Sequence, residues 1–281
     1  MRRALMMLAA TLLLTGLALA TGSAGSRSAV AAHPVARAHH SATIAVIGAN
    51  KSTNWFGYNQ GTLEKGGTTF HAITGNWTVP KVSEHRLPNG STPDEFSSTW
   101  IGIGGGCVDA GCAVGDNTLI QTGTEQDMVG GKPQYSAWWE LIPAPSIGIT
   151  MTVGPGDHIH ADIHEVVSGS EVWSITLADT SRHETFTQTV GYPSTYTTAE
   201  WIAETPLILG TNGGFATLPN LSPAVFDPGT VNRASPRLKS SEQIQLANSS
   251  GTVYSVPSGP DRDTDGFTAC AWAKSCAAPG T

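Results

Sequence analysis

Charged residues are scarce in this sequence, and basic residues are the scarcer kind. Charged side chains make up 13% of the chain, with 15 Lys and Arg against 22 Asp and Glu, which gives a formal net charge of −7. Binding to nucleic acid or to an anionic membrane requires clustered Lys and Arg that displace counterions. No such cluster occurs in the chain, so we expect neither nucleic acid nor a membrane as a partner of the mature protein.

Long apolar runs are missing everywhere except at the N-terminus. There, Arg2 and Arg3 precede an apolar run over residues 4–20 that ends in Ala-Leu-Ala, the small residues that a signal peptidase recognises. The run is shorter than the roughly 20 apolar residues that a membrane span needs. We therefore expect residues 1–24 to be a signal peptide and the mature protein to be secreted and extracellular.

Acidic residues are absent from the first 50 positions. Residues 25–50 are rich in Ala, Ser, His and Arg, a composition with little to bury. We expect a propeptide here, with a disordered N-terminal segment of no further role as the alternative. Loss of residues 1–50 removes four arginines and no acid, so the formal charge moves from −7 to −11. The mature protein is therefore acidic.

Cysteine is limited to four residues, which form two close pairs: Cys107 with Cys112, and Cys270 with Cys276. An even number in an exported protein predicts disulfides. Three connectivities are possible, and we favour the two local ones because each closes a short loop. A zinc site would require tighter spacing and a reducing compartment.

Helical periodicity is weak beyond the signal peptide, whereas Gly and Pro recur between short alternating runs. This pattern predicts an all-β sandwich or barrel, and the absence of a linker or repeat predicts one domain over residues 51–281. Residues 207–236 show no strand pattern, and we expect residues 261–276 to be a C-terminal loop pinned by its own disulfide. The alternating runs predict seven strands, at residues 70–74, 98–103, 118–122, 135–141, 147–153, 172–177 and 184–190.

The familiar hydrolase signatures are also missing. The chain has no Gly-x-Ser-x-Gly, no His-Glu-x-x-His and no paired Asp-Thr/Ser-Gly turns. A metal-binding candidate is the run His158-Ile-His-Ala-Asp-Ile-His164, because alternate residues of a strand share one face. Two neighbouring histidines there could share one metal ion. A solvated outer sheet face explains the same pattern, and we favour that interpretation and assign no metal ligand.

What the chain does contain is an ordered set of aromatic and carboxamide strings. These are Asn54-Trp-Phe-Gly-Tyr, Gly75-Asn-Trp-Thr-Val-Pro80, Ser98-Thr-Trp-Ile-Gly-Ile-Gly-Gly, Leu119-Ile-Gln-Thr-Gly-Thr-Glu125, Tyr135-Ser-Ala-Trp-Trp-Glu140 and Thr198-Ala-Glu-Trp-Ile-Ala-Glu204. In this order they resemble the glutamic peptidases, also called eqolisins or the G1 class. The resemblance runs from about Asn54 to about Pro206 and continues more weakly to the C-terminus.

This resemblance implies a concanavalin-A-like, jelly-roll sandwich of two antiparallel sheets with a cleft on its concave face. It also implies a secreted endopeptidase that needs no cofactor and cleaves proteins or peptides, and we expect a monomer. The catalytic pair of the family maps onto Gln121 and Glu200. Positions that line the cleft map onto Trp55, Trp100, Trp138 and Glu140.

The residue types suit peptide hydrolysis. A glutamate among aromatic walls has its neutral form favoured by desolvation, so it can accept a proton from water and return it to the leaving amine. A glutamine does not titrate. Its NH₂ can donate to the oxyanion while its carbonyl oxygen orients water.

Two features depart from the family pattern. Gly104, Gly105 and Gly106 stand where members often carry Asp-Gly, and Ser136 stands where an Asp often lies. These neutral replacements reduce the acidity of the cleft and weaken the expectation of a strongly acidic pH optimum.

Two other function classes remain open at this stage. A carbohydrate-binding, lectin-like module also presents aromatic residues on a concave sandwich face. A glycosidase would use two carboxylates, for which Glu140 and Glu200 are candidates. Hydrolysis of a denatured protein separates the peptidase from both.

Overall fold

The computed structural model describes residues 38–39, 44–208 and 214–280. The predicted signal peptide lies outside these residues. Over the described part, regular structure is almost entirely β, with one short 3₁₀-helix, η1 (Ser240–Glu242). The prediction of an all-β fold is therefore confirmed. Within the described residues, we find no helix with the length and hydrophobicity of a membrane span.

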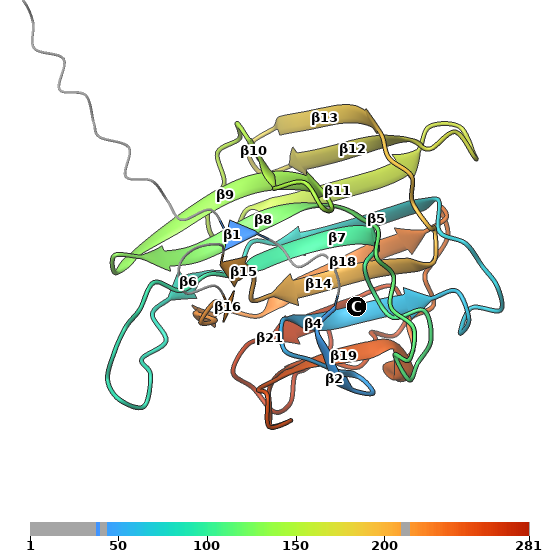
Figure 1. The fold of residues 1–281 in the computed structure, drawn as a ribbon. Helices are drawn as coiled ribbons and strands as arrows, with labels where there is room; N and C mark the ends of the chain where they lie inside the picture. The colour runs from blue at the N-terminus through green and yellow to red at the C-terminus, as the bar shows by residue number, and fades with distance from the viewer. Residues whose placement is uncertain (1–37, 40–43, 209–213, 281) are drawn as a thin grey trace, which may run out of the picture. The chain divides into compact units, whose positions relative to one another are not determined.

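Most strands form one hydrogen-bonded path that folds over on itself (Figure 1). All neighbouring strands of its first half pair antiparallel. In spatial order, this half contains β10 (Ile147–Ile149), β9 (Lys132–Leu141), β8 (Leu119–Val129), β7 (Ser98–Gly104), β14 (Thr198–Glu204), β4 (Trp55–Gly61) and β19 (Gln243–Ala247).

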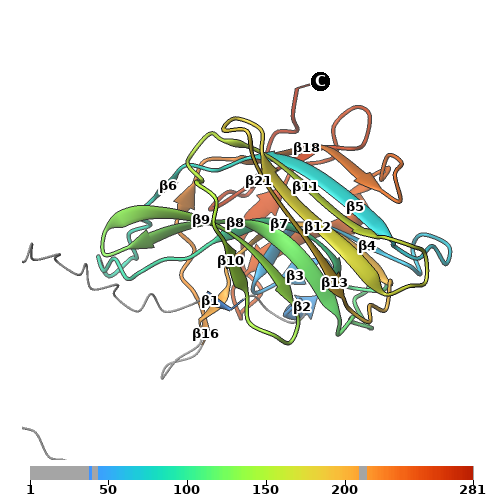
Figure 2. The same cartoon turned by 90° about the horizontal axis from the view of Figure 1, so that it is seen from above.

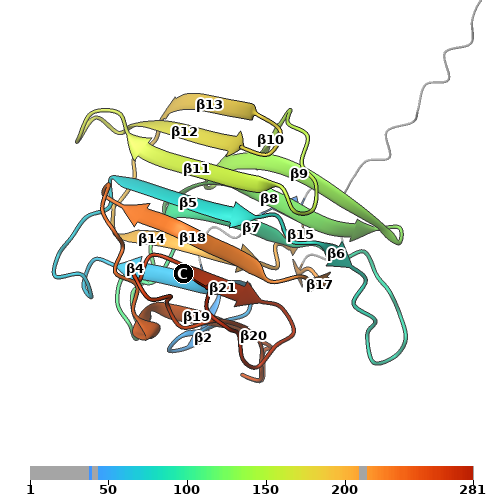
Figure 3. The same cartoon turned by 180° about the vertical axis from the view of Figure 1, so that it is seen from behind.

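The second half is also antiparallel, and Figure 3 shows it from behind the view of Figure 1. The crossing between the halves is made by β20 (Val253–Pro257) and β21 (Phe267–Cys270). Beyond them, in spatial order, lie β18 (Ala224–Val231), β5 (Ala72–Thr78), β11 (His158–Glu165), β12 (Val172–Asp179) and β13 (Glu184–Gly191).

Short strands complete the structure. β2 (Val46–Gly48) pairs with β3 (Lys51–Ser52), and β3 runs parallel to β19. The chain from Val46 onward is thus part of the sheet. Two small separate sheets contain, first, β1 (Ala38–His39), β15 (Leu207–Ile208) and β16 (Gly214–Phe215), and second, β6 (Val82–Ser83) and β17 (Asn220–Leu221).

The two halves pack face to face, as Figure 2 shows from above, and the main core lies between them. Strand β5 contacts β7, and β11 and β12 contact β8. In β14, alternate residues Ala199, Trp201 and Ala203 point into this core. The sandwich prediction is therefore confirmed, and the residues between them, Glu200 and Ile202, project from the opposite face.

All seven predicted strands are present, with ends that shift by a few residues. Two expectations are wrong. Residues 207–236 contain the eight-residue strand β18, which was not predicted because Pro228 interrupts its strand pattern. The pairing with β5 shifts register between Phe226 and Gly229, and this bulge accommodates the proline. The C-terminal loop contains β21, which pairs with β18 and β20.

Both favoured disulfides are present. Cys107 pairs with Cys112 and Cys270 pairs with Cys276, with Cα atoms 4.8 and 5.8 Å apart. Each stabilises its loop by about 2 kcal/mol through chain entropy, so neither is what makes the fold possible.

Candidate active site

Five residues on adjacent strands form one row across the first half of the sheet. Residues directly opposite one another on paired strands project from the same face. The predicted pair therefore shares a face and is separated by the single strand β7, or about 10 Å between Cα atoms. From β9 to β4, the pairing aligns Glu140, Gln121, Gly102, Glu200 and Asn59.

The middle of this row carries no side chain. Gly102 lies opposite Gln121 on one side and opposite Glu200 on the other. A Cβ atom here would lie 2.9 Å from both the Trp100 ring and the Leu119 side chain. Only glycine fits here, because the Trp100 ring and the Leu119 side chain occupy the space that a Cβ atom would need.

The three predicted cleft tryptophans lie on the same face. Trp55 and Trp100 meet edge to face with ring centroids 4.9 Å apart, and Trp138 belongs to the same apolar cluster. The Trp100 indole N–H donates to Glu204 Oε2 at 2.9 Å. The fold thus brings together all six residues that the sequence assigned to the site, although they come from five strands.

This face is closed in the structure. The exposed fraction is 0% for Gln121 and Glu200 and at most 2% for the three tryptophans. Ile44 packs in the same apolar cluster as Trp55 and Trp100, and its backbone N–H donates to Gly105 O at 2.9 Å. A residue of the predicted propeptide therefore helps to close the face that was expected to form an open cleft.

Glu200 is held in an environment that favours its neutral form. Burial raises the pKa of its carboxyl well above the ordinary value, the Thr198 hydroxyl opposes this shift, and the negative charge of Asp116 adds to it. Thr198 Oγ1 accepts from Gly106 N at 3.2 Å, so its own proton remains available to the carboxyl group.

Two neighbours of Glu200 were not identified from the sequence. The Asn59 side chain donates to Cys107 O at 2.8 Å and accepts from Cys107 N at 2.9 Å. These two hydrogen bonds to the backbone hold the loop after β7 over Glu200, and Gly106 of that loop lies directly against the carboxyl group. Asn59 follows the first aromatic string, but nothing in the string distinguishes it from a surface asparagine.

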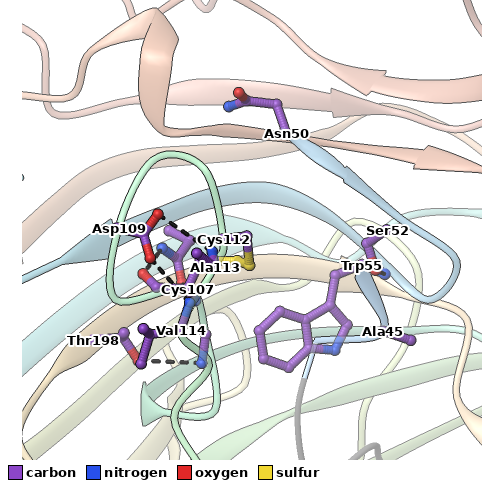
Figure 4. Close-up of a disulfide and its surroundings, with 12 residues drawn as sticks. Ala45, Asn50, Ser52, Trp55, Cys107, Asp109, Cys112, Ala113, Val114 and Thr198 are labelled. Carbon is purple, nitrogen blue, oxygen red and sulfur yellow. Dashed lines mark hydrogen bonds between the residues drawn. A yellow bond between two sulfur atoms is a disulfide. The ribbon is translucent and has the colours of Figure 1, made fainter. Parts of the chain in front are cut away.

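The loop itself is fixed by the Cys107–Cys112 disulfide, which Figure 4 shows close to Trp55. The Asp109 carboxylate accepts from Ala113 N at 3.3 Å and from Val114 N at 3.0 Å, and these bonds lower its pKa. The Cys107–Cys112 loop is therefore a rigid cover beside the candidate site rather than a loose insertion.

Gln121 is oriented by Glu140. Its Nε2 donates to Glu140 Oε2 at 2.8 Å, and a carboxylate can only accept, so the amide nitrogen must face Glu140. The carbonyl oxygen Oε1 is buried and, among the described residues, has no hydrogen-bond partner. It is therefore available to a water or a substrate group.

The histidine run lies elsewhere, on the outer face of β11. His160 Nδ1 contacts Asn76 Oδ1 at 2.9 Å, and His164 Nδ1 contacts the neighbouring Asp162 carboxylate. These side chains are partly exposed. They form a polar outer sheet surface that takes no part in the candidate site.

Comparison with models of protein families identifies the family of this chain. The model of the peptidase A4 family matches residues 53–264, which is most of the sequence and includes every residue of the row. The chain belongs to the peptidase A4 family. The predicted membership among the eqolisins, or glutamic peptidases, is thereby confirmed.

Sequence identity to one curated relative is low. Aspergillopepsin-2 of Aspergillus niger is 26% identical over 155 residues, which are 49% of this chain and 52% of that protein. The match thus spans about half the length of this relative.

Solved structures support the fold. Scytalido-glutamic peptidase with a transition state analog inhibitor superposes with a TM-score of 0.59 at 18% identity, over 78% of this chain and 98% of that one. SCP-B, an eqolisin in complex with the tripeptide Ala-Ile-His, superposes with a TM-score of 0.53 at 17% identity and the same coverage.

Proposed function

We propose that this A4 family member is a secreted, monomeric endopeptidase that cleaves peptide bonds of proteins at acid pH. The observation that carries the proposal is the row in which Gln121 and Glu200 flank Gly102 on one sheet face. Secretion is supported by the two disulfides, which persist in oxidising compartments.

Glu200 is the general base and acid in this proposal. Once water enters the site, desolvation weakens and the raised pKa falls towards its ordinary value. The ionised carboxylate then takes a proton from the water that attacks the peptide carbonyl carbon. It returns this proton to the amine nitrogen as the C–N bond breaks, so the carboxylate is regenerated.

Gln121 positions the water and stabilises the oxyanion. Its Oε1, which has no hydrogen-bond partner in the described part of the chain, accepts from the attacking water. The N–H that is not bound to Glu140 donates to the oxyanion of the tetrahedral intermediate. Glu140 is a positioning residue, because its hydrogen bond fixes the direction of the amide. Loss of one such oxyanion donor costs about 100- to 1000-fold in rate.

The N-terminal segment regulates access. Ile44 bonds to Gly105 and packs with the cleft tryptophans, so we propose that residues 25–50 act as a propeptide and that cleavage within residues 41–53 opens the face. N-terminal sequencing of the active form tests this. An active enzyme that retains residue 25 would contradict it.

A glycosidase is less well supported. Its two carboxylates would be Glu140 and Glu200, which lie three strand spacings apart, about 14 Å between Cα atoms. Gln121 stands between them and is bonded to Glu140. The two carboxyl groups of a glycosidase flank the scissile bond directly, whereas here the Gln121 side chain lies between them.

The decisive experiment is digestion of an unfolded protein across pH 2–7, with products sequenced by mass spectrometry. The wild type is expected to produce internal cleavage, and Gln121→Ala is expected to lose about 100-fold or more of the rate. Glu64→Gln, a carboxyl outside the row, serves as the matched control. Equal cleavage by Gln121→Ala and the wild type would reject the proposed machinery.

A further inference from the structure

A second group of acidic side chains lies away from the row, where the C-terminal loop meets β18. Asp227 is at the bulge of β18, and Asp261 and Asp265 are in the loop between β20 and β21. One carboxylate oxygen from each lies within 4.8 Å of the other two. Oxygens that share a Ca²⁺ ion at about 2.3–2.6 Å can be no more than about 5 Å apart, so this spacing suits a common cation.

Asp261 is the residue that points to a ligand. Its side chain is only 7% exposed, and Oδ1 accepts from Asp265 N at 3.1 Å. The second oxygen, Oδ2, is buried and has no hydrogen-bond partner among the described residues, and the same holds for Asp265 Oδ1. Buried carboxylate oxygens that lack a donor are costly unless a cation satisfies them.

The backbone around Asp261 forms a tight cradle. Gly266 lies so close that a Cβ atom there would be 2.5 Å from Asp261 Oδ2. The Asp261 N–H donates to Gly266 O at 2.9 Å, and Gly229 N donates to Asp265 O at 2.8 Å. The loop is thus attached to β18, and Asp261 Oδ2 is directed towards the space it shares with Asp227.

The three carboxylates lie together without a cationic partner in the described part of the chain. Among the ion pairs of the described residues, none includes any of the three carboxylates. A bound divalent cation would remove the repulsion between them.

The loop sequence fits the same conclusion. Asp261-Arg-Asp-Thr-Asp-Gly266 resembles the Asp-x-Asp-x-Asp-Gly start of a calcium loop, in which the glycine makes the sharp turn. The match is partial, because the side chain at its third position, Asp263, is exposed and does not converge with Asp261 and Asp265. The bidentate Glu that ends a complete twelve-residue loop is replaced here by Trp272. Asp227 supplies a carboxylate from another strand in its place.

We propose that Asp227, Asp261 and Asp265 bind a calcium ion that fastens the C-terminal loop to β18. A ligand set made only of oxygen atoms favours Ca²⁺ over zinc, which prefers nitrogen and sulfur, and water completes the coordination. Strands β20 and β21 carry the sheet from one half to the other, so the ion stabilises the crossing between the halves. This role is independent of peptide hydrolysis.

The test uses the full chain at pH 7, freed of metal by EDTA and dialysis. Calorimetric titration with CaCl₂ is expected to show one site. The unfolding temperature is expected to rise by about 5–10 °C when free Ca²⁺ exceeds the dissociation constant by about 100-fold. No heat of binding together with no shift would overturn the proposal, and an equal shift with MgCl₂ would overturn the assignment to calcium.

Variants locate the site. Asp261→Asn is expected to abolish the calcium-dependent shift, and Asp227→Asn, at the rim on β18, tests the same site if the first variant fails to fold. Asp263→Asn removes an equal charge from the same loop, but it is exposed and outside the three converging carboxylates. Retention of the shift in Asp263→Asn supports the site, and equal loss in all three variants would show a diffuse charge effect instead.

Discussion

The backbone of Gly106 lies directly against the carboxyl group of Glu200. A Cβ atom at position 106 would stand 2.5 Å from Glu200 Oε1 and 1.7 Å from the oxygen of Asn59. Real Cβ atoms do not approach other atoms so closely, so only glycine fits here. Gly106, which the sequence analysis described as a departure from the family pattern, is therefore part of the candidate site.

Gly106→Ala is expected to displace Asn59 and the loop that it holds. Overpacking of a buried site typically costs about 1–3 kcal/mol, and the shift of Glu200 should reduce turnover by more than tenfold. The measurements are thermal unfolding and kcat on an unfolded protein substrate. Gly111→Ala in the same loop, where a Cβ would meet only Asp109 at 3.1 Å, is the control and is expected to change stability by less than about 0.5 kcal/mol.

Glu200→Gln is expected to lower kcat by about 100- to 10,000-fold, because the amide cannot take a proton from water. The same change should increase stability at neutral pH. Since burial raises the folded pKa of Glu200 above its ordinary value of 4.5, the native carboxyl costs stability as pH rises past that value. Melting curves at pH 4 and pH 7 measure this.

Glu204→Gln is the matched control for Glu200→Gln. Position 204 lies on the same sheet face as Glu200. The amide oxygen of a glutamine there can still accept from the Trp100 indole N–H, as the Glu204 carboxylate does. Its loss of activity should be much smaller. Equal losses of activity at both positions, with unchanged near-UV circular dichroism, would show that the assignment of Glu200 as the catalytic carboxyl is wrong.

Gln121→Glu tests the other member of the pair. The new carboxyl would lie within hydrogen-bond distance of Glu140, as the amide does now at 2.8 Å. The new carboxyl could donate to the oxyanion only while it is protonated, so residual activity should move to lower pH, even though repulsion between like charges raises a pKa of this pair. A pH profile of kcat that keeps its wild-type position would contradict this role of Gln121.

Glu165 is expected to support stability in acid. Its burial would raise the pKa, but bonds from Gly169 N, His71, Glu171 N and the Tyr196 hydroxyl outweigh this and lower it to about 2. The folded pKa lies below the ordinary 4.5, so this contribution is present above pH 4.5 and is lost as pH falls towards 2. Glu165→Gln should flatten the loss of stability over this range in acid titrations followed by circular dichroism, and an unchanged slope would refute the assignment.

Much of the fold follows from local sequence. The predicted strand at residues 172–177 becomes β12, and the one at residues 184–190 becomes β13, because alternation of apolar and polar side chains specifies both the strand and its buried face. Strand β18 could not be predicted in this way. Pro228 and Gly229 contradict strand propensity, and only pairing with β5 on one side and β21 on the other stabilises it.

The candidate site also has features that the sequence predicts and features that depend on the fold. The aromatic and carboxamide strings can be found in the sequence, and their resemblance to the glutamic peptidases predicted that Gln121, Glu200 and the three tryptophans belong to one site. The folded chain was needed to show that Asn59 and Gly106 enclose Glu200, that Ile44 joins the cleft face, and that Asp227 meets the C-terminal loop. These are contacts between residues more than 30 positions apart, and their geometry depends on strand register and loop closure, which no local pattern encodes.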